Sequence, residues 1–366
     1  MAILYSDRKE ELFLMSAENR VIHTILAGLG RIGWNTHLPA LLAHPGFQVS
    51  AVVDPAEERL AECRQTFGIP GFHTLAEALK RGAFDLAVIA SPTCFHAEQT
   101  IAALRAGCHV FCDKPAAMNL SEFLRMKTAA EENRRILTIY QPARISRHTL
   151  FMKGLIHSGK LGNVFLVKLL RERFSRRNDW QALRRNGGGM LLNYGSHMVD
   201  QSNFLFDAPG RVLTCTADRV LSCGDADDAV KLLLRYDGPV TVDIDINQAA
   251  ADSMFRYAVF GSEGSAVLPA EGDAWRIRLL KESGRSAAEL HADLSAPGRK
   301  YPPSEAEFQC ETAIPPEAIP PVTQYYENLY RAVTTGEKLL NPLSETENLI
   351  RMLDRAGEIA GETSAL

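Results

Sequence analysis

Apolar and polar residues alternate in blocks along the first part of the chain, and the pattern predicts a parallel α/β sheet. The β-branched run VIHTILA leads into a glycine-containing turn and a helix, and FQVSAVVD reads as a second buried strand. Three further apolar runs, LAVIA, CHVFC and ILTIY, are separated by the helical stretches SPTCFHAEQTIAALRAG and NLSEFLRMKTAAEENRR. Strands that alternate this regularly with helices indicate a doubly wound parallel sheet.

The pattern changes after ILTIY. A helix is predicted around HTLFMKGLIHSG, and the strands beyond it follow one another without intervening helices. VKLLLRY and VTVDIDINQ alternate apolar and polar residues and are joined by YDGP, a hairpin signal. One face of the second strand carries Val240, Val242, Ile244 and Ile246, and the other carries Thr241, Asp243, Asp245 and Asn247. These strands predict an open, mainly antiparallel sheet with one face covered by helices.

The length of 366 residues exceeds what one hydrophobic core usually supports, so we expect two domains that share a cleft. The predicted division is an N-terminal extension at 1–20, a Rossmann-type α/β domain at 21–142 and an α+β domain for substrate binding and oligomerisation at 143–366. Charged residues interrupt the apolar positions of the extension, which leaves no signal-peptide core, and no later apolar run is long enough to span a bilayer.

Composition narrows the class of protein. A hydrophobic fraction of 46%, a charged fraction of 23% and a formal net charge of −4 give no strong positive field, so nucleic acid is not an expected partner. The seven cysteines form an odd set without a CxxC pair, which favours reduced thiols in a cytoplasmic protein and gives no sign of a metal site.

The stretch GLGRIG matches the GxGxxG pattern in its required place between a strand and a helix. Gly28 permits a tight turn, Gly30 lets the backbone approach a pyrophosphate, and Gly33 lets the helix pack against the strand. Arg31 and Ile32 complete this predicted nucleotide-binding turn.

Asp54 ends the second strand, 21 residues past Gly33, where an acid accepts the adenosine ribose hydroxyls of a dinucleotide. An acid there repels a 2′-phosphate, so NAD is favoured over NADP. Arg31 could pair with that phosphate and weakens this preference.

Further polar residues follow the fourth and fifth strands, at the carboxyl edge where such sheets bind ligands. Lys114 would supply a cation that polarises a hydroxyl or stabilises an alkoxide. His96 is predicted to cap the following helix or to pack beneath the cofactor. The residues expected at this edge are Ser91, Pro92, Thr93, His96, Asp113, Lys114 and Pro115.

The stretch GGGMLLNYGSHMVD places Asn193 and His197 four residues apart, on one face of a predicted helix. A neutral imidazole can act as a general base, and an amide can position a substrate oxygen. The three glycines would let substrate or cofactor approach the backbone. Asp200 could fix the tautomer of His197 or could cap another group, and Tyr194 is a weaker acid or base candidate.

Between the first strand of the second domain and these glycines lies RERFSRRNDWQALRRN, which contains six arginines. Such a cluster could recognise a carboxylate or phosphate of a substrate, or it could form a solvated loop or a subunit contact. Trp180 could stack on a sugar ring or pack in the core.

The order of three motifs, GLGRIG, AVIASPTCFHAEQTIAALRAGCHVFCDKP and GGGMLLNYGSHMVD, resembles the Gfo/Idh/MocA oxidoreductase family from residue 20 onward. The resemblance implies that Lys114 lies beside the nicotinamide ribose and the reacting hydroxyl, that the bond before Pro115 is cis, and that His197 accepts the proton. The family usually carries Asp where this chain has Asn193. Loss of that carboxylate leaves more of His197 neutral at pH 7.

The resemblance therefore implies an NAD(P)-dependent dehydrogenase that transfers hydride between nicotinamide and a secondary hydroxyl or ketone of a sugar, polyol or related cyclic substrate. His197 would take the proton, Lys114 would organise the oxygen, and Asn193 would hold the neighbouring hydroxyl. Two alternatives stay open: an NAD-using glycosidase of the same fold, and a non-catalytic nucleotide-binding regulatory protein. Relatives pair subunits through the second sheet, so a homo-dimer or homo-tetramer is expected, although the polar face argues against a strongly apolar interface.

Overall fold

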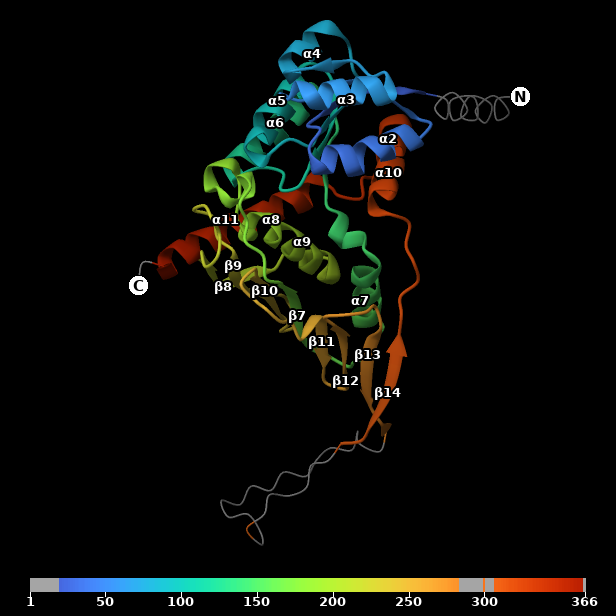
Figure 1. Cartoon of the computed structure of the whole chain (residues 1–366). Coiled ribbons are helices and arrows are strands. Elements are labelled where there is room, and N and C mark those ends of the chain that lie inside the picture. Colours follow the sequence, from blue (N-terminus) through green and yellow to red (C-terminus); the bar gives the residue numbers. More distant parts are fainter. Residues whose placement is uncertain (1–19, 283–298, 300–305, 365–366) are drawn as a thin grey trace, which may run out of the picture.

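The computed structural model describes residues 20–282, 299 and 306–364, arranged in two lobes that each contain one sheet (Figure 1). The expected N-terminal extension therefore lies, apart from Arg20, outside the described residues. None of the described helices is both long and apolar enough to cross a membrane.

The first sheet has six parallel strands in the order β3-β2-β1-β4-β5-β6. Both faces are apolar: β4 and β6 are buried at every position, as expected of strands covered by helices on both sides. The strands are β1 (Ile22–Ala27), β2 (Phe47–Val53), β3 (Gly71–Phe72), β4 (Leu86–Ile89), β5 (His109–Asp113) and β6 (Leu137–Tyr140). The first lobe's helices are η1 (Gly33–His37), α2 (Leu38–Ala43), α3 (Glu57–Phe67), α4 (Leu75–Arg81), η2 (Thr93–Phe95), α5 (His96–Arg105) and α6 (Leu120–Asn133).

The second sheet has eight strands in the order β14-β13-β12-β11-β7-β10-β9-β8, antiparallel except for the central β7–β10 pair. The fold prediction, a doubly wound parallel sheet followed by a mainly antiparallel one, is confirmed. The predicted hairpin is β9–β10, with Leu234 opposite Val242. The strands are β7 (Val164–Glu172), β8 (Arg211–Asp218), β9 (Ala229–Arg235), β10 (Thr241–Asn247), β11 (Phe255–Gly261), β12 (Gly264–Pro269), β13 (Trp275–Leu280) and β14 (Phe308–Ala313).

Helices cover one face of the second sheet, and the apolar face of β10 is buried beneath them, as its alternation predicts. The long helix α11 runs across this layer (Figure 1). The helices of this part of the chain are η3 (Pro142–Ile145), α7 (Arg147–His157), η4 (Trp180–Ala182), η5 (Arg184–Asn186), α8 (Met190–Asn193), α9 (Gly195–Phe206), α10 (Pro321–Thr335) and α11 (Leu343–Ser364).

The end of the chain returns to the first lobe, which the strand pattern did not indicate. Tyr325, Tyr326 and Leu329 of α10 are buried in the same core as Ile22 and Leu26 of β1, beside α2 (Figure 1). Helix α11 then contributes Ile350 to the core of the first sheet and Leu353 to that of the second. The two C-terminal helices therefore pack against both lobes and fix the position of one lobe relative to the other.

Candidate active site between the two sheets

The structure places the predicted cofactor residues at the carboxyl edge of the first sheet, and the three glycines of the turn differ in their surroundings. Gly28 has a φ of +100°, and a Cβ on Gly33 would lie 1.8 Å from the Gly28 carbonyl oxygen. A Cβ on Gly30 would meet no atom within 4 Å. Gly28 and Gly33 are therefore required by the fold itself, whereas Gly30 faces open space, as a close approach to a pyrophosphate demands.

This difference gives a prediction. Gly30→Ala is expected to leave the unfolding midpoint unchanged and to weaken NAD binding at least about tenfold, or ~1.4 kcal/mol, because the new methyl group occupies the space of the phosphates. Gly33→Ala is expected to lower the midpoint, because its methyl group collides with backbone. Titration calorimetry and thermal unfolding of both variants test this. If Gly30→Ala binds NAD with wild-type affinity, the glycine turn is not part of the NAD-binding site.

Asp54 is almost fully buried, and its carboxylate accepts hydrogen bonds from the backbone N–H of Leu29, at 2.9 Å, and of Ala56, at 3.0 Å. Arg59 also pairs with it at 3.2 Å. The predicted ribose acceptor therefore also fixes the glycine turn. Arg31 is exposed, and the cation beside Asp54 is Arg59. The sequence did not indicate Arg59, because the spacing of residues along a helix does not show that a side chain folds back to the end of a strand.

The turns after β4 and β5 are joined through His96. Its two ring nitrogens lie 2.8 Å from the Ser91 carbonyl oxygen and 2.9 Å from that of Pro115, and burial lowers the pKa of the imidazole. The Lys114–Pro115 bond is cis, as the resemblance implied. His96 therefore joins the two turns to each other, and its place beneath a bound cofactor stays a prediction.

Lys114 reaches from this edge to the second lobe. Its Nζ atom donates to Asn193 Oδ1 at 2.6 Å and to the Asn193 carbonyl oxygen at 3.1 Å. The amide of Asn193 in turn donates to Gln181 Oε1 at 3.0 Å. Burial, together with the charges of Arg31 and Arg177, lowers the pKa of Lys114 to about 8 against the opposing pull of Asp113.

His197 lies on α9, one turn after Asn193, but the helix predicted for both residues is interrupted at Tyr194 between α8 and α9. The ring is half-buried, and its Nδ1 atom is buried without a hydrogen-bond partner in the described part of the chain. Burial and the charge of Lys114 hold the pKa of His197 well below its ordinary value. The imidazole is therefore neutral near pH 7, the form that a general base requires.

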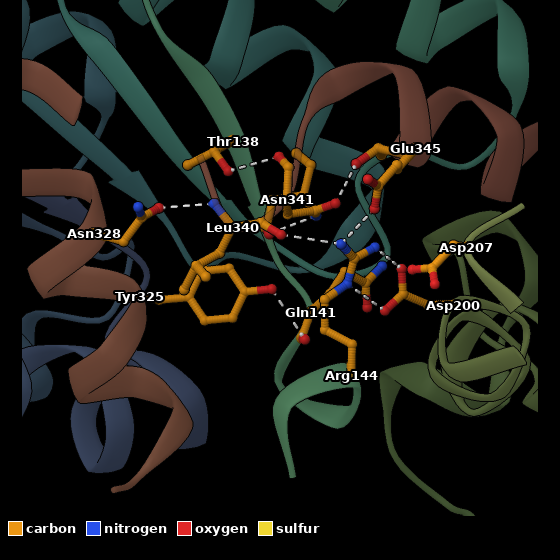
Figure 2. Close-up of polar contacts among 12 residues, drawn as sticks. Thr138, Gln141, Arg144, Asp200, Asp207, Tyr325, Asn328, Leu340, Asn341 and Glu345 are labelled. Carbon is orange, nitrogen blue, oxygen red and sulfur yellow. Dashed lines mark hydrogen bonds and ion pairs between the residues drawn. The ribbon is translucent and has the colours of Figure 1, made fainter. Parts of the chain in front are cut away.

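Of the two alternatives for Asp200, the structure shows the second: its carboxylate bonds to another group and not to His197. Both of its carboxylate oxygens accept from Arg144, one of them from Nε at 3.0 Å, and Arg144 also donates to Glu345 at 2.6 Å and to the Leu340 carbonyl oxygen at 3.1 Å (Figure 2). The three-residue spacing to His197 was misleading because the partner comes from η3, 56 residues earlier in the chain.

The glycines of GGGMLLNYGSHMVD pack against protein and not against an open site. A Cβ on Gly187 would lie 2.7 Å from Thr93 Cβ, and one on Gly189 would lie 2.4 Å from Asp227 Oδ1. The glycines do allow a close approach, as expected, but the groups that approach them are protein: Thr93 of the other lobe and Asp227 of a neighbouring loop. This approach brings the turn after β4 against the segment that carries Asn193.

A cavity of about 480 Å³ opens beside His197. Arg171, from the predicted arginine cluster, lies over the Tyr194 ring, with 4.9 Å between its guanidinium carbon and the ring centroid. Trp180 is not among the lining residues, and no group of three described His, Cys, Asp or Glu residues could hold a metal ion. The cavity is lined by Pro142, Ala143, Ser146, Leu170, Arg171, Glu172, Tyr194, His197, Met198, Gln201, Ser253, Arg256, Tyr257, Ala270 and Pro321.

Comparison with known proteins is consistent with this arrangement. The family model "Oxidoreductase family, NAD-binding Rossmann fold" (GFO_IDH_MocA) matches residues 22–141, and the "GFO/IDH/MocA C-terminal domain" model matches 149–267. An uncharacterized oxidoreductase of Schizosaccharomyces pombe, C115.03, is 30% identical over 256 residues, 67% of this chain and 70% of that protein. The scyllo-inositol 2-dehydrogenase (NADP(+)) IolW of Bacillus subtilis is 25% identical over 94% of this chain and 96% of its own length.

Solved structures share the fold. An NAD-binding protein from Listeria innocua has a TM-score of 0.81 and 22% identity, covering 94% of this chain and 98% of that one. The WlbA dehydrogenase from Bordetella pertussis, in complex with NADH and UDP-GlcNAcA, has a TM-score of 0.75 and 20% identity over the same shares of the two chains.

Proposed function

The chain belongs to the GFO/IDH/MocA oxidoreductase family, with an NAD-binding Rossmann fold, and we propose that it moves hydride between nicotinamide and a secondary hydroxyl or ketone of a sugar, polyol or related cyclic substrate. The observation that carries the proposal is the convergence of Lys114 from the first lobe with Asn193 and His197 from the second: Lys114 bonds to Asn193, its charge acts on His197, and His197 lines the 480 Å³ cavity. Relatives named inositol 2-dehydrogenases support this substrate class.

The described residues fit a nicotinamide dinucleotide, since Gly30 opens on unfilled space while Gly28 and Gly33 are closely packed. When bound, NAD supplies the hydride acceptor. The proposed binding residues are Gly28, Gly30, Arg31, Ile32, Gly33, Asp54, Ser91, Pro92, Thr93, His96, Asp113 and Lys114.

We assign the proton and the charge of the reaction to three side chains. His197 accepts the hydroxyl proton on its imidazole ring, because burial keeps the ring neutral. The Lys114 ammonium stabilises the negative charge that develops on the substrate oxygen. Asn193 is a positioning residue: its amide holds Nζ at 2.6 Å and is itself held by Gln181, which fixes the cation before substrate arrives.

These roles predict the pH dependence of turnover. Lys114 has a pKa of about 8 and must be protonated to stabilise the oxyanion, so kcat/KM is expected to fall as pH rises through about 8. Because the pKa of His197 lies well below 6.5, no acid limb is expected near that value. Initial rates across pH test this, with Asn193→Asp as the diagnostic variant: its carboxylate next to Nζ should move the alkaline limb upward. A rate that increases through pH 8 would contradict the role of Lys114.

A turnover assay tests the proposed function itself. Purified protein is incubated with NAD or NADP and pooled sugars, polyols and sugar acids, and reduced nicotinamide is followed by absorbance. Sustained turnover is expected. Nucleotide that is bound without any net reduction would instead favour the glycosidase or the regulatory protein.

We also propose a cytoplasmic homo-dimer or homo-tetramer that pairs through the outer face of the second sheet. That face carries a ladder in which Asp243 pairs with Lys168 at 3.3 Å and with Lys231 at 2.5 Å. Its polar character suits an interface with matched charges. All seven cysteines lie in the described part of the chain, and no disulfide joins any of them, in keeping with a reducing compartment.

A further inference from the structure

We propose that the substrate carries a carboxylate, as a sugar acid does, and that Arg171 and Tyr194 bind this group in the cavity beside His197. This inference rests on the proposed function and narrows its substrate class. Arg171 is the next-to-last residue of the central strand β7, and Tyr194 lies at the junction of α8 and α9, next to the proposed catalytic residues. Both side chains line the cavity together with His197.

The guanidinium of Arg171 is held in place but is not neutralised. It lies 4.9 Å over the Tyr194 ring, and its Nη2 atom donates to the phenol oxygen at 3.3 Å. A guanidinium has five N–H donors, and among the described contacts Arg171 uses only this one and pairs with no carboxylate. Stacking fixes the plane of the group, which lowers the entropy cost of engaging a bidentate ligand.

The phenol adds a second donor in the same corner. Because Tyr194 accepts from Arg171, its own O–H is free to donate to a ligand oxygen. A planar guanidinium and an adjacent hydroxyl match the two oxygens of a carboxylate, and hydrogen bonds of this charge-assisted kind are stronger than those between neutral groups.

The surrounding charge has the sign that an anion needs. Although burial raises the pKa of Tyr194, the hydrogen bond from Arg171 and the charges of Arg177 and Arg173 outweigh it, so the pKa of the phenol is lowered. Glu172 also lines the cavity, but no ion pair in the described residues joins it to Arg171.

Other arginines near the cavity do not offer the same site. Arg256 lines it too, but its N–H groups go to Asp273 and to the carbonyl oxygens of Pro269 and Gly272. Arg177 pairs with Asp179 at 3.2 Å. Of the two arginines that line the cavity, Arg171 is thus the one that forms no ion pair with a described acidic side chain.

The test compares matched neutral and acidic sugars, glucose with glucuronate and galactose with galacturonate, in wild type, Arg171→Gln and Tyr194→Phe. Wild type is expected to prefer the acidic member of a pair. Arg171→Gln should raise KM for the acid about 30-fold, with a few-fold change in kcat and no change in KM for the neutral sugar. Tyr194→Phe, which keeps the stacking and loses the hydroxyl, should have a smaller effect on the same KM.

The matched control is Arg278→Gln. Arg278 lies over the Phe308 ring at the same 4.9 Å, but on β13 and outside the residues that line the cavity, so its removal should leave every constant at the wild-type value. An unchanged unfolding midpoint in Arg171→Gln will show that its effect is not loss of fold.

Equal use of neutral and acidic sugars by wild type, or an equal loss on both in Arg171→Gln, would overturn the inference. A preference for sugar phosphates would overturn the assignment to a carboxylate. Calorimetric titration of glucuronate and glucose in the presence of NADH separates the two proposals. Arg171-dependent binding of the acid without turnover refutes the dehydrogenase and leaves the carboxylate site standing, whereas absence of both binding and turnover refutes both.

Discussion

Replacing His197 by alanine is expected to lower kcat by about 10²- to 10⁴-fold, the usual contribution of a general base, while the affinity for NAD stays close to that of wild type. The imidazole is neutral because burial and the Lys114 charge oppose its protonation, and no other described histidine lines the cavity. Without it, the substrate hydroxyl must release its proton to water as hydride leaves.

Steady-state kinetics and NAD titration on the same preparation measure both quantities. His157→Ala serves as the matched control, because His157 is also on a helix of the second lobe but bonds to the Leu205 carbonyl oxygen, away from the cavity. If His197→Ala turns over at the wild-type rate, the base is another group, and Tyr194 is then the first candidate.

Replacing Arg144 by methionine is expected to destabilise the protein by about 3–5 kcal/mol, because it leaves the Asp200 carboxylate buried without its partner. The side chains of Arg144 and Asp200 are 2% and 1% exposed. The guanidinium also joins Glu345 and the Leu340 carbonyl oxygen, so it connects η3, α9, the chain before α11 and the first turn of α11 (Figure 2).

Urea unfolding measures the loss. The control is Arg331→Met, which removes an exposed pair with Glu327 and should cost about 0.5 kcal/mol or less. The double variant Arg144→Met, Asp200→Leu should recover much of the stability, because no buried charge is left unpaired. If Arg144→Met is as stable as the control, Asp200 is not an unpaired anion in that variant and the ion pair does not hold the lobes together.

The sequence predicts local and repeating features of the molecule well. The strand and helix order, the glycine turn, the β9–β10 hairpin and the apolar face of β10 all depend on neighbours a few residues apart. It does not show which distant residue meets a given side chain. Arg144 opposite Asp200 and Gln181 beside Asn193 are pairings between elements, and helix spacing within one element cannot predict them.

The return of α10 to the first lobe could not be predicted from the sequence for the same reason, because it is a contact between distant parts of the chain. Its tyrosines give an apolar helix face, but nothing local in the chain indicates which core that face covers. The three glycines before Asn193 were assigned to a ligand, whereas the structure fills the space beside them with Thr93 and Asp227. A glycine shows that something approaches closely, and only the fold shows that the neighbour is protein.

The most direct test of the proposed reaction follows the hydride itself. Sugars and polyols deuterated at their carbinol carbons are incubated with the protein and NAD, and the reduced nicotinamide is analysed by mass spectrometry. Direct hydride transfer predicts one deuterium in each molecule of reduced nicotinamide with wild type, and little product with His197→Ala. Deuterium that stays in the substrate while nucleotide is bound and never reduced would contradict the dehydrogenase assignment.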